Sequence, residues 1–180
     1  MKATTHGKML AILGLALSLG LAAVGCGRPF KIKTAPGFVE LEEQAREGYG
    51  YRATTPDGVV IGVRVVDDEE RGDLPFWVRS LTLQLRDIKG YALLSSTDVR
   101  ASDGTPGKRL RFGSDEGNKP YLYDVALFRT ADRLFLVESG GPKDLMERAD
   151  RSVEWMLASL KVRCNTFISP VLASRTCNRW

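Results

Sequence analysis

Histidine is almost absent from this chain of 180 residues, in which His6 is the only one. A histidine-ligated zinc site is therefore excluded, and a Ser-His-Asp or Cys-His arrangement would depend on His6 alone. His6 lies in a segment that the sequence predicts to be cleaved off. The commonest general base at neutral pH is then missing from the mature chain. We predict no catalytic residue, no metal site and no cofactor.

Acidic residues are missing from the first 39 positions. Lys2 and Lys8 precede an apolar run over residues 9–24, in which Ser18 is the only polar side chain. A short basic segment followed by about 16 apolar residues is typical of a secretory signal. The run is short for a membrane-spanning helix, which needs roughly 20 apolar residues. We predict that residues 1–25 are a signal peptide of the lipoprotein type.

The apolar run stops at the stretch AVGC, residues 23–26. This stretch resembles the lipobox of bacterial lipoproteins, where small or branched residues and then Gly or Ala precede a cysteine. The resemblance implies cleavage before Cys26, lipidation of its thiol and acylation of its new amino group. Ala23 departs from the pattern, because leucine is commonest at that place. An ordinary signal with a chance cysteine and an uncleaved anchor stay as alternatives.

A lipid on Cys26 gives the chain an expected location. One acyl chain binds a membrane only marginally, whereas a diacylglyceryl group with an N-acyl chain exceeds what stable anchoring needs. We therefore expect a protein of the cell envelope, attached to the membrane through its lipid. Gly27 follows the cysteine, whereas Asp there is associated with retention in the inner membrane. The expectation is the outer membrane, with the domain facing the periplasm or the surface.

Cysteine is scarce as well, and only Cys164 and Cys177 follow Cys26. Their separation of 13 residues fits neither a C-x-x-C redox pair nor a zinc ribbon. Cysteines of exported proteins tend to pair. We predict a Cys164–Cys177 disulfide that closes the C-terminal segment.

Neither sign of charge is in large excess once residues 1–25 are removed. The remaining chain has 24 Lys and Arg against 22 Asp and Glu, a net charge of +2. This value is too small to indicate a nucleic-acid partner. The expected partners are the membrane, through the lipid anchor, and an envelope protein or ligand that the sequence does not identify.

The mature chain divides into three parts. Residues 26–48 are predicted to be a lipidated tether leading into the domain. Its basic residues Arg28, Lys31 and Lys33 can sit against anionic head groups, although three of them contribute little. Residues 49–163 are predicted to be one α+β domain, and residues 164–180 a tail. Within the domain, hydrophobic periodicity and Gly/Pro punctuation set the elements. The predicted strands are 50–55, 59–66, 91–100, 108–112, 121–129 and 133–138, and the predicted helices are 75–89 and 142–160.

The predicted order is β-β-α-β-β-β-β-α. Short connections between successive strands indicate antiparallel hairpins. The strands at 121–129 and 133–138 are apolar on both faces, whereas a sheet covered on one side alternates with polar residues. Two helices on opposite faces would account for this. The predicted fold is an α/β/α sandwich around an antiparallel sheet.

That succession resembles the PsbP-like superfamily, which includes a photosystem extrinsic protein, a Ran-binding nuclear transport factor and bacterial lipoproteins. The stretches that carry the resemblance are YRATTPDGVVIGVRVV, LPFWVRSLTLQLRD, DGTPGKRLRFG, YLYDVALFRTADRLFLVESG and VEWMLASLKV. It covers about residues 49–163 and brings no catalytic motif with it. The resemblance implies a binding or assembly module.

Two charged stretches are candidate sites. Arg109 and Arg111 share one face of a predicted strand and, if that strand adjoins the one carrying Arg64, the three would form an anion-binding patch. Solvated arginines are the alternative. The acidic run at residues 67–70 lacks the spacing of a calcium loop, so we expect a solvated loop there.

Two functions stay open at this stage. The favoured one is a lipid-anchored, non-catalytic binding or assembly module of the cell envelope. The alternative is an envelope hydrolase that uses carboxylates, for example on glycan, which requires two carboxylates about 5 to 10 Å apart. The surroundings of Glu138 distinguish the two functions, because this carboxylate ends an apolar strand beside two glycines. A second carboxylate opposite Glu138 favours the hydrolase, and an arginine favours binding.

Overall fold

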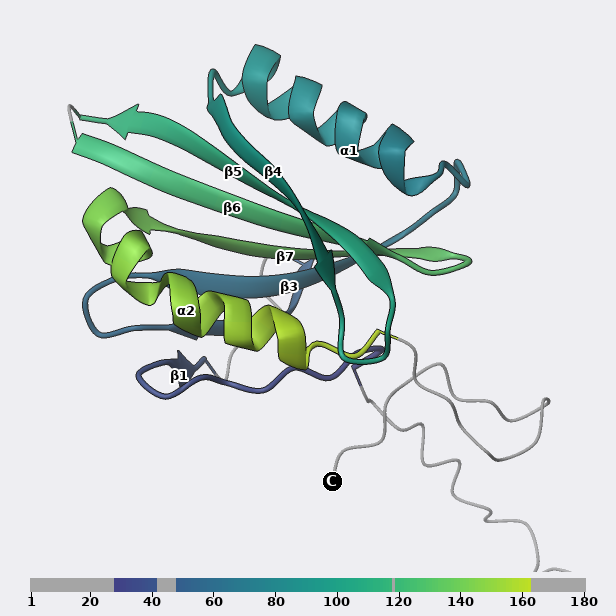
Figure 1. Cartoon of the computed structure of the whole chain (residues 1–180), viewed down its shortest axis with the longest axis horizontal. Coiled ribbons are helices and arrows are strands. Elements are labelled where there is room, and N and C mark those ends of the chain that lie inside the picture. The colour runs from purple at the N-terminus through teal and green to yellow at the C-terminus, as the bar shows by residue number, and fades with distance from the viewer. Residues whose placement is uncertain (1–27, 42–47, 118, 163–180) are drawn as a thin grey trace, which may run out of the picture.

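The computed structural model describes residues 28–41, 48–117 and 119–162. Its strands are β1 Val39–Glu40, β2 Tyr49–Thr54, β3 Val60–Asp67, β4 Ala92–Arg100, β5 Pro106–Glu116, β6 Lys119–Arg129 and β7 Arg133–Pro142, and its helices are α1 Leu74–Leu83 and α2 Lys143–Ser159. All seven strands form one antiparallel sheet in the order β1-β2-β3-β7-β6-β5-β4. The two helices lie on opposite faces of it (Figure 1). The α+β sandwich and its element order are confirmed, with the short β1 added at the start.

Two predicted element boundaries are wrong. The segment between the predicted strands 108–112 and 121–129 is mostly strand, because β5 and β6 continue as a hairpin whose last pair is Glu116 with Lys119. Polar residues are accommodated there since this end of the hairpin is exposed to solvent. The Gly-Gly-Pro stretch at 140–142 belongs to β7, where Gly140 pairs with both Val60 and Tyr123. Helix α2 consequently begins at Lys143, one residue after the proline.

Helix α1 begins where its sequence predicts. The Asp73 carboxylate caps it by accepting the Phe76 N–H at 2.7 Å, and Pro75 occupies the first turn, where a missing N–H costs nothing. The helix then continues as a π-helical turn, Gln84–Ile88. Leu85 of this turn joins Leu110, Phe112 and Val125 in a small core over β5 and β6. No residue of α1 itself is fully buried, so this helix covers its face of the sheet only in part.

Helix α2 and the opposite face enclose the larger core. Residues that alternate inward along the strands meet the inward stripe of the helix, as the 3.6-residue and two-residue periods require. The fully buried side chains include Tyr51, Ile61, Val63, Phe128, Phe135, Met146, Met156 and Leu160. Val63 on β3 and Val137 on β7 face α2, so their chain neighbours Arg64 and Glu138 face the α1 side.

Residues 28–41 form a belt that packs along the domain, although the sequence suggested a tether for this part of the chain. Phe30 is 2% exposed and meets Phe135 edge-on at 6.4 Å between ring centroids. Lys31 pairs with Lys161 by two backbone hydrogen bonds of 2.9 and 2.8 Å. The folded unit thus includes residues 28–41 and does not begin at residue 49, because Phe30 and Phe38 complete the larger core.

None of the helices in the described ranges combines the length and the apolar character that crossing a membrane requires.

Candidate functional site

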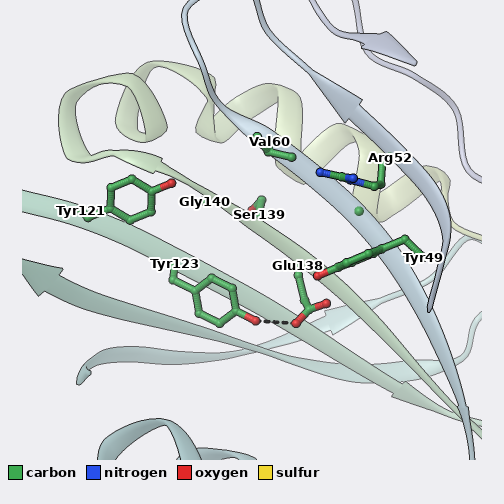
Figure 2. A pocket seen from close by; sticks show the side chains of 9 residues that line it. Tyr49, Arg52, Val60, Tyr121, Tyr123, Glu138, Ser139 and Gly140 are labelled. Carbon is green, nitrogen blue, oxygen red and sulfur yellow. Dashed lines mark hydrogen bonds between the residues drawn. The ribbon is translucent and has the colours of Figure 1, made fainter. Parts of the chain in front are cut away.

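The α1 side of the sheet is open over β2, β3 and β7, because α1 packs mainly on β5 and β6. A cavity of about 220 Å³ lies on this open part (Figure 2). Its lining comes from four strands, β2, β3, β6 and β7, and consists of Tyr49, Arg52, Val60, Gly62, Tyr121, Tyr123, Glu138, Ser139 and Gly140. The cavity therefore combines tyrosine rings with one carboxylate and one guanidinium among its described lining residues.

Glu138 is the most deeply placed charged group of this cavity, with its side chain 9% exposed. Its Oε1 accepts a hydrogen bond from Arg64 Nη2 at 2.6 Å and another from the Tyr123 hydroxyl at 2.6 Å. The arginine that favours binding over hydrolysis is therefore present. Among the described residues that line the cavity no second carboxylate faces Glu138.

Two polar atoms of this cluster are buried without a hydrogen-bond partner among the described residues. One is Glu138 Oε2, and the other is Arg64 Nε. The Tyr49 hydroxyl lies beside the same carboxylate (Figure 2), close enough for hydrogen bonding to Glu138 to contribute to the raised pKa of Tyr49. Its orientation in the structure nevertheless leaves Oε2 without a hydrogen bond. A buried acceptor left unpaired costs about 1–3 kcal/mol. Such an atom at a cavity is a place for a donor from outside the chain.

Two glycines make room for the tyrosine rings. A Cβ on Gly62 would come within 2.7 Å of the Tyr49 ring, and one on Gly140 within 3.4 Å of the Tyr121 ring. The rings thus lie close over the backbone of β3 and β7. The guanidinium groups of Arg52 and Arg64 lie 5.7 and 5.3 Å from the centre of the Tyr49 ring, within the range of cation–π attraction.

The electrostatics of the cluster keep the tyrosines neutral. Burial raises the pKa of Tyr49 to about 12, and the adjacent Glu138 carboxylate adds to this shift. Burial, followed by the charge of Glu138, also raises the pKa of Tyr123. Burial of Arg64 opposes its charge, but the attraction of Glu138 outweighs this and raises the arginine pKa. The cluster therefore holds the Glu138–Arg64 pair between neutral phenols.

The predicted anion patch of Arg64, Arg109 and Arg111 does not form, because β7 and β6 separate β3 from β5. Arg109 and Arg111 point to the opposite face, under α2. Both donate to Asp124 on β6, with Arg111 Nε at 2.8 Å from Oδ1, and Arg109 Nη2 reaches Asp150 of α2 at 2.6 Å. The solvated alternative is also wrong for Arg109, whose side chain is 8% exposed. These arginines attach α2 to the sheet.

The charged groups of the cluster under α2, formed by Arg109, Arg111, Asp124 and Asp150, pair with one another. Burial of Asp150 works against its charge, but hydrogen bonds from Arg109 and Arg111 outweigh this and lower the pKa of the carboxyl. Hydrogen bonds to Asp124 first, and to Asp150, raise the pKa of Arg111 although burial opposes its charge. No atom of Arg109, Arg111, Asp124 or Asp150 is among the buried polar atoms that lack a partner in the described chain.

A second hollow of about 570 Å³ is lined in part by Arg64, whose guanidinium pairs with Glu138 of the first. Asp67, Glu69 and Glu70 line it, and all three are exposed to solvent. Asp68 corrects the expectation of a solvated acidic run. Its side chain is 0% exposed, accepts from Trp77 Nε1 at 3.0 Å and from Arg129 Nε at 2.6 Å, and so ties the loop before α1 to the sheet.

Cys26, Cys164 and Cys177 lie outside the described residues, and lipidation and the disulfide stay predictions. Within the described ranges, no group of three or more Cys, His, Asp or Glu side chains is placed to hold a metal ion.

Sequence reasoning singled out Glu138 and Arg64 but missed the tyrosines of the cavity. Their only signal was weak: Tyr121 and Tyr123 stand at i and i+2 on one strand, so they share a face. Tyr49 comes from a different hairpin, and only the β3–β7 pairing brings it beside Glu138. Gly62 opposite Glu138 in that pairing is the feature that admits the Tyr49 ring.

No protein-family model matches the sequence, and no curated protein is similar to it in sequence. Solved structures do resemble it. LpqN of Mycobacterium tuberculosis, involved in cell envelope biogenesis, aligns with a TM-score of 0.57 at 11% identity, over 73% of this chain and 82% of LpqN. The Ran-binding protein Mog1p of Saccharomyces cerevisiae aligns at 0.50 and 13% identity, over 74% of this chain and 90% of Mog1p. A point mutant of Mog1 aligns at 0.53 and 14% identity, with the same coverage.

Identities of this size show a common fold and no more. The likeness to a Ran-binding protein agrees with the fold that the PsbP-like resemblance implied. The chain therefore has the α+β fold that LpqN and Mog1p share.

Proposed function

We propose that this protein is a lipid-anchored, non-catalytic binding module of the cell envelope, and that its binding site is the open cavity around Glu138. The observation that carries the proposal is the unpartnered Oε2 of Glu138, buried at that cavity among tyrosine rings. LpqN, which shares the fold, is involved in cell envelope biogenesis, and this supports the setting. The lipobox-like stretch ending at Cys26 supports the anchor.

The chemistry of the site selects the ligand by charge. An anionic ligand would meet the ionised Glu138 carboxylate in a poorly solvated place and be repelled. A cationic ligand would gain little, because Arg64 already neutralises Glu138 at 2.6 Å and Arg52 also lines the cavity. A neutral ligand with a hydroxyl or amide donor satisfies Oε2 without either conflict. We therefore propose a neutral, donor-bearing ligand that packs against the tyrosine rings.

The hydrolase alternative gains no support from this geometry. Glycoside hydrolysis needs two carboxylates on either side of the scissile bond, and the described lining of the cavity offers Glu138 alone. Glu138 moreover faces the guanidinium of Arg64 at 2.6 Å, where a second carboxylate would have to stand.

Backbone amide NMR of the mature chain tests the site. Glucose and N-acetylglucosamine serve as neutral probes, and acetate and methylammonium as charged probes of small size. We expect the neutral probes to shift the amides of Gly62, Glu138 and Gly140, and the charged probes to leave them in place. Shifts caused by acetate or methylammonium alone would contradict the proposed chemistry.

Substitution of the carboxylate separates binding at the site from weak binding elsewhere. In Glu138→Gln, Oε1 must still accept from Arg64 and Tyr123, so the new amide NH₂ takes the place of Oε2 and donates where an acceptor is needed. We expect the shifts to disappear. Glu154→Gln is the matched control, because Glu154 lies on α2 with its side chain 62% exposed, and it should bind as the parent does.

The anchor is tested separately by mass spectrometry and fractionation of the envelope. We expect the mature protein to begin at Cys26 with a lipid-modified mass, and Cys26→Ser to leave the membrane fraction or stay as an uncut precursor. Normal membrane retention with an unmodified mass at Cys26 would refute lipidation without touching the cavity.

A further inference from the structure

The cavity around Glu138 and the second hollow follow one another along β3. Side chains of a strand alternate between its two faces, and those on the α1 side of β3 are Val60, Gly62, Arg64 and Val66. The first two line the cavity, and the last two line the second hollow. At about 3.3 Å per residue, Gly62 and Val66 lie about 13 Å apart along the strand. We call this row of four residues, with the two hollows above it, the β3 surface.

A β-bulge supplies the aromatic ring that lies over β3 in the cavity. The pairing of β2 with β3 shifts between Tyr49 and Tyr51, so that Gly50 is an extra residue. Tyr51 is buried in the larger core, and in a regular strand Tyr49 would point the same way. The bulge turns Tyr49 to the open face instead, where it lines the cavity (Figure 2). Bulges that re-aim a side chain are typical of strands next to functional sites.

The second hollow has an aromatic ring of its own, the indole of Trp77. This side chain is partly exposed, and its Nε1–H donates to the buried Asp68 carboxylate at 3.0 Å. Val66, which is 44% exposed, lines the same hollow. A ring that is already fixed within the protein loses little freedom when a ligand packs on it. The β3 surface thus offers an aromatic contact in each of its two parts.

The polar groups of the β3 surface suit hydroxyl groups. The Arg64–Glu138 pair leaves one buried donor, Nε, and one buried acceptor, Oε2, without a hydrogen bond. A hydroxyl both donates and accepts, whereas an amide N–H only donates and a carbonyl only accepts. Farther along, the exposed carboxylates of Glu69 and Glu70 accept from hydroxyls and repel an anionic chain. A ligand with many hydroxyls and no negative charge therefore fits both parts.

We infer that the proposed binding site takes a neutral, linear oligosaccharide, which lies along β3 with one sugar ring in the cavity and another against Trp77. Sugar rings present C–H groups to an aromatic ring and hydroxyls at their edges. The cavity of about 220 Å³ is smaller than the roughly 300–1,000 Å³ of pockets that enclose a drug-sized ligand, which suits one ring of a longer chain. This inference rests on the proposed function, and it adds the class of the ligand and the length of its contact.

Chain length tests the inference. The probes are N-acetylglucosamine and its β-1,4-linked dimer and trimer, titrated into the mature chain and followed by amide NMR and by the Nε1–H signal of Trp77. A second ring that buries about 55 Å² of apolar surface tightens binding about tenfold. We expect the trimer to bind about tenfold more tightly than the monosaccharide and to shift the Trp77 signal, which the monosaccharide leaves in place. Equal affinity for the two, or a Trp77 signal that the trimer does not move, would overturn the inference.

Filling the second hollow locates the contact. Val66→Arg places a long side chain there, and we expect the ratio of trimer to monosaccharide affinity to fall from about tenfold to about one. The matched control is Val39→Arg, which makes the same change of charge at a valine of β1 that is 62% exposed, and it should keep the ratio. Circular dichroism and thermal unfolding show whether both variants keep the fold. A ratio that persists in Val66→Arg, or that falls equally in both variants, would overturn the inference.

Two peptide probes separate this inference from the proposed function. They are acetyl-triglycine N-methylamide, which is neutral, and acetyl-Lys-Gly-Lys amide, which is cationic. If the neutral peptide shifts the Glu138 amide and no saccharide does, the oligosaccharide is overturned and a neutral, donor-bearing ligand stands. Shifts of the Trp77 signal by the lysine peptide alone would make the second hollow a site for cations and overturn the inference. If no neutral probe shifts the amides of Gly62, Glu138 and Gly140, both proposals fail.

Discussion

The sheet has an arginine–carboxylate cluster on each face, and the two differ in burial and in how fully their polar atoms are hydrogen-bonded. Under α2, Asp124 accepts from both Arg109 and Arg111, and the side chains of Asp124 and Arg109 are 3% and 8% exposed. On the open face, Glu138 is buried but Arg64 is 38% exposed, and each has an unpaired buried atom. The first cluster is complete within the chain, whereas the second still has an acceptor to offer. Burial of charge alone does not distinguish a structural ion pair from a binding site. What distinguishes them is whether buried donor and acceptor atoms are left without a hydrogen bond inside the protein.

The largest expected effect is on the complete cluster. Asp124→Ala leaves Arg109 buried without its main partner, and we expect the free energy of unfolding to fall by about 3–5 kcal/mol. Urea denaturation followed by circular dichroism measures it. Asp98→Ala is the control, because that carboxylate is 90% exposed beside Lys108 and such pairs contribute about 0–1 kcal/mol. A loss under about 1 kcal/mol for Asp124→Ala would erase the distinction between the clusters.

A smaller effect is expected at the open cluster. Glu138→Gln removes the charge that pairs with Arg64, but this guanidinium can turn toward water, as its 38% exposure allows. We expect the free energy of unfolding to fall by about 1 kcal/mol. The same urea experiment checks it. A loss as large as that of Asp124→Ala would make Glu138 a structural residue and weaken the case for a binding site.

Replacing the glycines beneath the tyrosine rings by alanine tests how closely the rings of the open face pack on the sheet. In Gly62→Ala the new Cβ would lie 2.7 Å from the Tyr49 ring, so the ring must move, and we expect a stability loss below about 1 kcal/mol with altered Tyr49 NMR signals. Gly140→Ala should change less, because its contact with Tyr121 is 3.4 Å. Signals of Tyr49 that stay in place in Gly62→Ala would show that the ring does not rest on this glycine.

The smallest effect is expected for the ionisation of Tyr49, which takes place at high pH and leaves the structure at neutral pH unchanged. Burial raises the pKa of Tyr49 from 10.0 to about 12, so the neutral phenol is favoured by the fold. Its contribution to stability is fully present below the unfolded pKa of 10.0 and is lost as the pH rises through about 12. Tyrosinate absorbance should show Tyr49 ionising after the more exposed tyrosines, and Glu138→Gln should lower its pKa in part. Ionisation of Tyr49 at its ordinary pKa would remove the electrostatic account of the cavity.

Much of the fold could be predicted from local pattern. The alternation around Val63 defines β3, and Pro75 defines the start of α1, because both signals depend on neighbours in sequence. The β3–β7 pairing could not be predicted, since it joins residues that are 66 to 80 positions apart. For the same reason the patch of Arg64 with Arg109 and Arg111 was wrong, whereas Glu138, which depends on one strand end, was identified. The belt was missed because Phe30 and Phe38 are too few to give a period.

The belt has a consequence for the order in which the protein folds. Lys33 meets Ser159 across 126 positions of sequence, and Lys31 bridges to Lys161, so the start of the belt docks only after the last helix has formed. Contacts of such separation form late, because a long loop must close before they are made. Val39 and Glu40 pair instead with the nearby β2 and do not depend on α2. The belt therefore closes from β1 toward Arg28, and its first residues complete the domain last.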